Sequence, residues 1–213
     1  MEKIFRKIGI STRVVNAEGY EEKRDALAQD WTTFLDNAGM IPVLIPNNLS
    51  NVSLFLDDMN LDGIILSGGD NIGENIDRDN TEKEIIKFGI DHKLPICGVC
   101  RGMQVLNKFF NGKMSSSKND EHVGEEHEVS ILNKSISDLL KQNKIIVNSY
   151  HQNIININDV GKPLISFAIH KKDNTVEGFI HEDLSIMGVM WHPEREKNSL
   201  LLKNFLENKL SVK

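Results

Sequence analysis

Short apolar runs alternate with longer amphipathic segments in the first half of the chain. The longer segments repeat apolar residues at helical spacing and predict helices at 21–39, 78–93 and 101–112. The apolar runs predict strands at KIGIST (7–12), MIPVLIP (40–46), LDGIILSGG (61–69) and LPICGV (94–99). Strand–helix alternation with short connections predicts an α/β fold, in which helices cover a doubly wound parallel sheet.

The pattern changes after residue 112. We expect some of the later strands to extend the main sheet and others to form a small antiparallel excursion. The chain shows no repeat and no linker, so we expect one domain over 1–213. Further strands are predicted at HEVSIL (127–132), KIIVNSY (144–150), LISFAIH (164–170), NTVEGFI (174–180) and SIMGVMWH (185–192), with a terminal helix at 196–210.

Charge and cysteine content narrow the classes of protein. The 213 residues carry a net charge of −6 without a basic stripe, so we expect neither nucleic acid nor a membrane surface as partner. No stretch is apolar enough for a bilayer span or a signal peptide. Two cysteines cannot form a disulfide framework, and we expect a cytoplasmic protein with reduced thiols.

The segment GVCRG (98–102) lies between an apolar strand and a helix, with the spacing of a nucleophile elbow. Gly98 and Gly102 permit a turn tight enough to project Cys100 above the sheet. The helix start favours a thiolate, and its free N–H groups can bind an oxyanion. By itself, the pattern is equally typical of a structural turn.

The pair Cys97-x-x-Cys100 also fits a redox motif or half of a zinc site. Cys97 falls inside the apolar strand, where a free cysteine acts as a small core residue. A zinc site lacks its second cysteine pair. We therefore predict a single nucleophile, Cys100.

A thiolate hydrolase needs a base and a group that orients the base. The segment MWHPE (190–194) ends an apolar strand and places His192 two residues from Glu194. Alone, it reads as a surface turn started by Pro193. Together with the elbow, it predicts a base and its orienting carboxylate.

The segments LSGGDN, GVCRGMQVLN, VNSYHQN and GVMWHPERE, in this order, closely resemble the class I glutamine amidotransferase-like hydrolases, and the free-standing γ-glutamyl hydrolase branch of peptidase C26 type fits best. The resemblance covers nearly the whole chain. It implies a flavodoxin-like sheet and a catalytic triad of Cys100, His192 and Glu194. Cys100 would attack a γ-glutamyl amide and form a γ-glutamyl thioester, which water hydrolyses to release glutamate.

The same resemblance assigns further residues to the substrate site. The oxyanion hole would consist of the backbone N–H groups of Gly69 and Arg101. Gln104 would contact the glutamyl group, although it could also be an exposed helix residue. The segment lining the glutamate pocket would be Asn148, Ser149, Tyr150 and His151. Of these, His151 could equally be an ordinary loop residue.

A narrower likeness concerns the leaving group. The segments at 9–31, DEHVGEEHEV (120–129), KKDNTVEGFIHE (171–182) and MGVMWHPERE (187–196) resemble γ-glutamyl-CDP-amidate hydrolases of bacterial capsule pathways. The implied partner is a small nucleotide-linked γ-glutamyl compound whose diphosphate needs cations nearby. We expect Arg13 or Arg101 to contact it, because a guanidinium can bond two phosphate oxygens. Arg13 could instead form a salt bridge to a neighbouring loop.

We expect no cofactor and no metal. His122 and His127 lie among glutamates in EHVGEEHEV, but the spacing is weak evidence for zinc and the resemblance places this segment near the substrate entrance without metal. The preceding loop at 115–120 could act as a lid. Other hypotheses remain: hydrolysis of γ-glutamyl-γ-aminobutyrate, a glutaminase subunit that feeds a synthetase, and a non-enzymatic member of the fold. The oligomeric state is not predicted.

Overall fold

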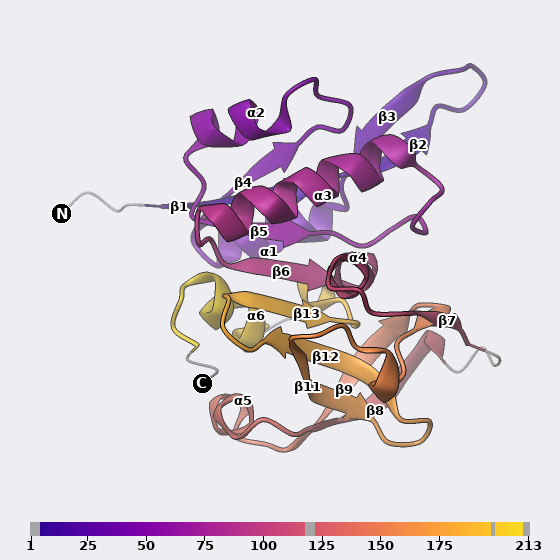
Figure 1. The fold of residues 1–213 in the computed structure, drawn as a ribbon, viewed down its shortest axis with the longest axis vertical. Coiled ribbons are helices and arrows are strands. Elements are labelled where there is room, and N and C mark those ends of the chain that lie inside the picture. Colours follow the sequence, from indigo (N-terminus) through magenta and orange to yellow (C-terminus); the bar gives the residue numbers. More distant parts are fainter. Residues whose placement is uncertain (1–4, 118–121, 197–198, 211–213) are drawn as a thin grey trace.

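The computed structural model describes residues 5–117, 122–196 and 199–210. Its centre is a nine-stranded sheet in the order β4-β1-β5-β6-β13-β12-β11-β8-β9 (Figure 1). The strands are β1 (Arg6–Ser11), β4 (Met40–Ile45), β5 (Gly63–Leu66), β6 (Ile96–Val99), β8 (Val123–Ile131), β9 (Lys144–Tyr150), β11 (Leu164–His170), β12 (Thr175–His181) and β13 (Ile186–Val189).

The sheet has a parallel and an antiparallel half. The strands from β4 to β13 pair in parallel, and those from β13 to β9 pair antiparallel. Short strands β7 (Ser115–Ser116) and β10 (Asn153–Ile154) form a separate ladder. The predicted α/β fold, a mostly parallel central sheet with a smaller antiparallel part, is confirmed. Every strand expected after residue 112 extends the main sheet.

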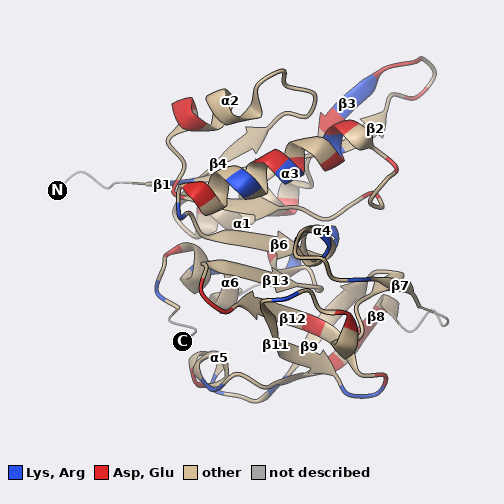
Figure 2. Cartoon of the chain, in the orientation of Figure 1, with Lys and Arg blue, Asp and Glu red and all other residues tan. Residues whose placement is uncertain are grey.

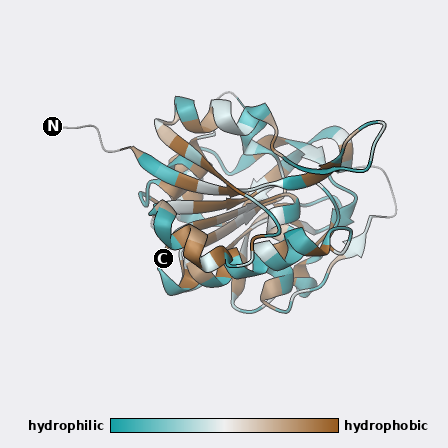
Figure 3. Cartoon of the chain, turned by 90° about the horizontal axis from the view of Figure 1, so that it is seen from above, coloured by the Kyte–Doolittle hydropathy of each residue, from teal (hydrophilic) through white to brown (hydrophobic). Residues whose placement is uncertain are grey.

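Helices cover both faces of the parallel half, as its uninterrupted apolar strands require. Successive residues of β5 and β6 alternate between two buried clusters, one on each face of the sheet. Figure 3 shows hydrophobic residues along the central strands and hydrophilic ones on the surrounding loops. The helices are α1 (Gln29–Asn37), α2 (Val52–Met59), α3 (Ile76–Asp91), α4 (Arg101–Phe109), α5 (Lys134–Leu140) and α6 (Leu200–Leu206), with 3₁₀ turns at Ile157–Asp159 and Pro193–Arg195.

The helix predicted over 21–39 is wrong in its first third. Lys23–Ala26 instead form β3, which pairs with β2 (Arg13–Asn16) in a hairpin projecting beyond the sheet (Figure 1). Asp25 anchors the hairpin by accepting hydrogen bonds from the backbone and side-chain nitrogens of Asn47 (2.9 and 2.6 Å). These tertiary contacts outweigh the local helical pattern. Helices α2 and α5 were not predicted, and α6 is shorter than expected.

Charged residues of both signs are interspersed along α3 and the β2–β3 hairpin (Figure 2). In the described part of the chain, no helix is long and apolar enough to cross a membrane. The lid predicted at 115–120 falls partly on residues 118–120, which lie outside the described residues.

Candidate active site

Three segments singled out in the sequence meet at one edge of the sheet. Because β5, β6 and β13 are adjacent and parallel, their carboxyl ends lie side by side. Ser67–Asp70 follow β5, Cys100 follows β6, and His192 lies three residues beyond β13. This edge is where ligands bind in open α/β sheets.

Cys100 occupies a sharp strand-to-helix turn. Its backbone has φ 52° and ψ −107°, a conformation that costs a non-glycine residue about 1–3 kcal/mol. A Cβ on Gly98 would lie 2.5 Å from the backbone of Gly102, and a Cβ on Gly102 would lie 2.0 Å from the carbonyl oxygen of Leu66. Both glycines are therefore required by the close approach of α4 to the sheet. The turn has the geometry of a nucleophile elbow.

His192 lies between Cys100 and Glu194. Its Nδ1 is 2.7 Å from Oε1 of Glu194, so that Nε2 remains for the thiol. A Cβ built on Gly68 would stand 2.8 Å from Cε1 of His192 and 3.5 Å from Cβ of Cys100, which shows that both side chains flank this glycine. The arrangement matches the geometric roles of nucleophile, base and orienting carboxylate.

The pKa of His192 reflects this environment. Burial alone lowers the pKa, but hydrogen bonds and charge interactions with Cys100 and Glu194 outweigh burial and raise it from 6.5 to about 9. The imidazolium is therefore the main form of His192 at neutral pH, and it lies between the sulfur of Cys100 and the carboxyl group of Glu194. An imidazolium can protonate the nitrogen of a departing amine.

This geometry predicts the pH dependence of hydrolysis. We expect kcat/KM to fall as pH rises through about 9, because His192 then loses the proton that the leaving group needs. Glu194→Gln removes a charge that raises the pKa of His192. It should move the alkaline limb to lower pH and reduce kcat/KM by about 100-fold or more. Rate profiles of both proteins test this, and an unmoved alkaline limb in Glu194→Gln would contradict it.

The two predicted oxyanion donors are present at the site. Gly69 has φ 120°, and Arg101 is the first residue of α4. Neither N–H makes a backbone hydrogen bond within the described ranges. Arg78 donates from Nη2 to the carbonyl of Gly68 (3.0 Å). Because the Gly68 carbonyl and the Gly69 N–H point in opposite directions from one planar peptide, Arg78 orients this N–H.

The side chain of Arg101 is not available to a leaving group, and this part of the prediction is corrected. It is 1% exposed and forms ion pairs with Asp79 and Glu82 of α3. Glu82 also accepts a hydrogen bond from Nε of Arg78 (3.1 Å). One buried carboxylate thus connects the two backbone segments that carry the predicted oxyanion donors.

Gln104 contacts Met190, and Asn148 contacts His192. Gln104 is buried in α4, so that its reading as an exposed helix residue is wrong, and its Nε2 lies 3.7 Å from Sδ of Met190. Asn148 of β9 donates to the carbonyl of His192 (3.0 Å) and accepts from the N–H of His192 (2.9 Å). Its amide therefore fixes the backbone of His192.

We expect Asn148→Ala to affect kcat more than KM. The substitution removes both hydrogen bonds that hold the His192 backbone, and a small displacement of a catalytic group can cost about 100-fold in rate. Asn148→Asp still accepts from the His192 N–H and should lose less. Steady-state kinetics of both variants test the assignment. A change confined to KM would instead support the predicted place of Asn148 in the glutamate pocket.

The mouth of the site carries two arginines. Arg13 is exposed, forms no ion pair within the described ranges, and lines a hollow together with Gly69 and His192. Arg195 lines the same hollow and lies over the ring of Tyr150, with Cζ 4.6 Å from the ring centroid. The Tyr150 ring in turn meets that of His192 edge-on, at 6.0 Å. A much larger hollow, of about 730 Å³, is lined by Glu194 but not by Cys100 or His192.

Ser149 and His151 point into the protein. The hydroxyl of Ser149 donates to the carbonyl of His122 (2.7 Å). His151 is buried beside His122 and Glu177. In the segment expected to line the glutamate pocket, Asn148 and Tyr150 thus lie next to His192. Ser149 and His151 instead face the interior beside His122.

Four residues near the site, Arg78, Glu82, Arg195 and Glu177, were not predicted from the sequence. Glu177 offered a signal, since NTVEGFI (174–180) reads as a buried strand and a carboxylate inside such a strand needs a partner. Arg78 and Glu82 are four apart on a predicted helix, a spacing equally typical of a solvated surface pair.

Comparisons with known proteins match nearly the whole chain. Residues 7–194, which include Cys100, His192 and Glu194, match the model of the Peptidase C26 family. A γ-glutamyl-CDP-amidate hydrolase of Campylobacter jejuni is 34% identical over 196 residues, which cover 89% of this chain and 90% of that protein. These two similarities relate the chain to the γ-glutamyl hydrolases.

Glutamine-hydrolysing proteins are also similar to the chain. A subunit of the glutamine-hydrolysing GMP synthase of Methanococcus vannielii is 27% identical over 168 residues, covering 78% of this chain and 82% of that protein. Among solved structures, a Thermoplasma acidophilum protein provisionally assigned as a GMP synthase subunit has a TM-score of 0.75 and 26% identity, covering 97% and 94% of the two chains. The class I glutamine amidotransferase fold is thus confirmed.

Proposed function

Since the chain belongs to the Peptidase C26 family, we propose that it hydrolyses a γ-glutamyl amide with Cys100 as nucleophile, His192 as acid and base, and Glu194 as the group that orients His192. One observation carries the proposal. The strained turn at Cys100 and the hydrogen-bonded pair His192–Glu194 lie together at the carboxyl ends of β6 and β13.

The reaction has two halves. The Cys100 thiolate attacks the γ-carbonyl carbon, and the oxyanion is held by the N–H groups of Gly69 and Arg101. His192 gives its proton to the leaving nitrogen, the C–N bond breaks, and a γ-glutamyl thioester remains. Water then attacks the thioester while His192 takes one of its protons. The C–S bond breaks, glutamate leaves, and the Cys100 thiolate is restored.

We propose γ-glutamyl-CDP-amidate as the substrate, with glutamate and cytidine diphosphoramidate as products. The similarity to the Campylobacter jejuni hydrolase supports this choice. The exposed arginine beside Gly69 supports it as well, because a diphosphate needs a cation near the scissile bond. Arg13 fits this role, and Arg101 does not.

Arg13→Ala should therefore weaken hydrolysis in a substrate-dependent way. We expect kcat/KM for γ-glutamyl-CDP-amidate to fall by about 10- to 100-fold, as one charge-assisted hydrogen bond lost to phosphate implies. For γ-glutamyl-γ-aminobutyrate, which has no phosphate, the loss should be less than about threefold. The matched control is Arg24→Ala, since Arg24 lies on the same hairpin but pairs with Glu22 and Tyr20. Equal losses on both substrates would refute a phosphate contact.

A second candidate is a glutaminase subunit that supplies ammonia to a synthetase. The likeness to glutamine-hydrolysing GMP synthase subunits over most of the chain favours it. Such a subunit would carry the same triad, and the difference lies in its dependence on a partner. Strong turnover by the chain alone would argue against this candidate.

The test is glutamate release by the purified chain from γ-glutamyl-CDP-amidate, γ-glutamyl-γ-aminobutyrate and glutamine, with Cys100→Ala as the blank. We expect a strong preference for the nucleotide. Preference for γ-glutamyl-γ-aminobutyrate would keep the reaction class and replace the substrate. Failure on all three would refute an autonomous hydrolase and favour the partner-dependent glutaminase.

A further inference from the structure

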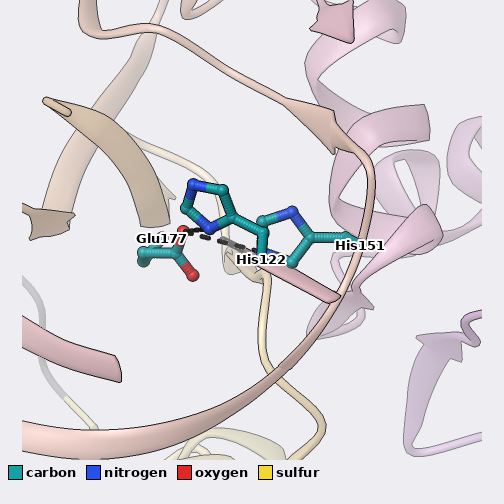
Figure 4. Close-up of side chains that lie close together, drawn as sticks. All are labelled: His122, His151 and Glu177. Atoms are coloured by element: carbon teal, nitrogen blue, oxygen red, sulfur yellow. Dashed lines mark ion pairs between the residues drawn. The ribbon is translucent and has the colours of Figure 1, made fainter. Parts of the chain in front are cut away.

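A buried cluster of ionisable side chains lies outside the triad. His122 precedes β8, His151 follows β9, and Glu177 lies in the middle of β12. Their side chains converge in Figure 4, where both imidazole rings face the carboxylate. The three are 0%, 4% and 1% exposed, and one potential ligand atom from each lies within 4.8 Å of the others.

The polar atoms that face one another in the cluster lack hydrogen-bond partners. They are Nδ1 of His122, Nε2 of His151 and both carboxylate oxygens of Glu177. A buried polar atom without a partner costs about 1–3 kcal/mol, and a charged one costs more. Four such atoms in one place indicate that something else binds between them.

The outer nitrogens of both rings are already occupied. Nε2 of His122 lies 2.7 Å from Oδ2 of Asp173, and Nδ1 of His151 lies 3.0 Å from the carbonyl of Asn153. Each contact holds a proton on the outer nitrogen, which leaves the inner nitrogen with its lone pair directed at Glu177. A carboxylate or carbonyl behind a histidine is the usual support of a metal-binding imidazole.

The distances suit a small divalent cation. Oε1 of Glu177 is 4.0 Å from Nδ1 of His122 and 3.7 Å from Nε2 of His151. Ligands about 2.0–2.1 Å from tetrahedral zinc stand about 3.4 Å apart. Oε1 therefore needs to approach each nitrogen by only about half an ångström, and the two nitrogens lie within 4.8 Å of one another. His127 supplies a further nitrogen, because its Nε2 is 3.4 Å from Oε2 of Glu177 and makes no hydrogen bond.

We propose that Nδ1 of His122, Nε2 of His151 and the carboxylate of Glu177 bind one zinc-class divalent cation, with Nε2 of His127 as the fourth ligand. Three imidazoles and one carboxylate are ligands that zinc prefers over magnesium or calcium.

The cation would act as a structural clamp. His122 and His151 lie at the same end of the antiparallel β8–β9 ladder, where Val123 pairs with Tyr150, and Glu177 lies in β12, which is not adjacent to β8 or β9 in the sheet. The backbone carbonyl of Glu177 accepts from the N–H of Met190, two residues before His192, and β9 carries Asn148. The proposed metal site thus contacts the segments that carry His192 but contains no residue of the proposed triad. The metal proposal does not depend on the proposed reaction. The proposal differs from our expectation of a chain without metal.

Metal binding is tested on the full chain, freed of any affinity tag and dialysed against a chelator. After addition of Zn²⁺ or Co²⁺ and gel filtration, elemental analysis should find one ion per chain. Co²⁺ should give the visible absorption of a tetrahedral site, which Zn²⁺ displaces, and either ion should raise Tm. Absence of retained Zn²⁺ and Co²⁺ in the folded wild-type chain would overturn the proposal, leaving a cluster bridged by water.

Variants locate the ion. Glu177→Gln keeps the side-chain shape and should weaken Co²⁺ binding at least about 100-fold, whereas Asp173→Asn, which removes only the support of His122, should weaken it about 10-fold. Circular dichroism verifies the fold of each. His92→Gln is the control, because His92 is a half-exposed histidine paired with Asp57 on the far helices. If Glu177→Gln does not fold, Asp173→Asn decides the location. Wild-type affinity in Asp173→Asn and in any folded Glu177→Gln would overturn the site.

Discussion

Cys100→Ala should abolish glutamate release from every γ-glutamyl substrate while leaving the fold intact. Removal of a nucleophile in a hydrolytic triad costs about 10,000-fold or more in kcat, because no other group forms the covalent intermediate. Alanine keeps the Cβ at φ 52°, so the strain at the turn persists and unfolding free energy should change by less than about 1 kcal/mol. Glutamate assays and urea unfolding measure the two effects separately.

Two companion variants sharpen this test. Cys100→Gly also removes the nucleophile but relieves the positive φ, and it should raise the unfolding free energy by about 1 kcal/mol or more. Cys97→Ala is the matched control, because Cys97 lies wholly in the core and burial raises the pKa of its thiol. It should keep activity within a few-fold and lose about 1–2 kcal/mol of stability. Loss of activity in Cys97→Ala as well as in Cys100→Ala would point to the redox hypothesis instead, because a redox pair needs both thiols.

The parts of this fold that were readable from sequence are those set by short-range patterns. β5 and β6 are continuously apolar because helices cover both faces, and both were predicted within three residues of their bounds. Cys100 directly follows β6, and His192 lies three residues beyond β13. The topology of parallel strands then places their side chains at one edge, so the candidate triad required no knowledge of side-chain contacts.

The parts that were not readable depend on contacts between distant segments. Lys23–Ala26 carry a pattern compatible with a helix, but their pairing with β2 and the anchor from Asp25 to Asn47 form only in the folded chain. The sequence places Arg101 beside the nucleophile as a free cation, and only the packing of α3 shows that its side chain pairs with Glu82. His122 and His151 join Glu177 only through the order of β12, β11, β8 and β9.

Gly102→Ala should be the most damaging substitution to the fold. In a helix this change normally stabilises by about 1 kcal/mol, so its sign here is informative. The new Cβ would stand 2.0 Å from the carbonyl oxygen of Leu66 and 2.7 Å from its carbon. Both are backbone atoms of β5, and neither α4 nor β5 can retreat without moving Cys100 or the 67–70 loop.

We therefore expect Gly102→Ala to lose about 3 kcal/mol or more of unfolding free energy, in the range that only severe core clashes reach. The folded fraction should also hydrolyse γ-glutamyl substrates more slowly, because relief of the clash displaces the first turn of α4 and the Arg101 N–H. Gly63→Ala is the control: Gly63 also lies in the sheet, but its Cβ would meet side-chain atoms of Ile8 and Pro95 at 3.2 Å. It should cost less than about half as much. Urea unfolding of the two variants tests this expectation. A Gly102→Ala chain as stable as the wild type would mean that α4 does not approach β5 so closely. The close approach that defines the elbow geometry would then be refuted.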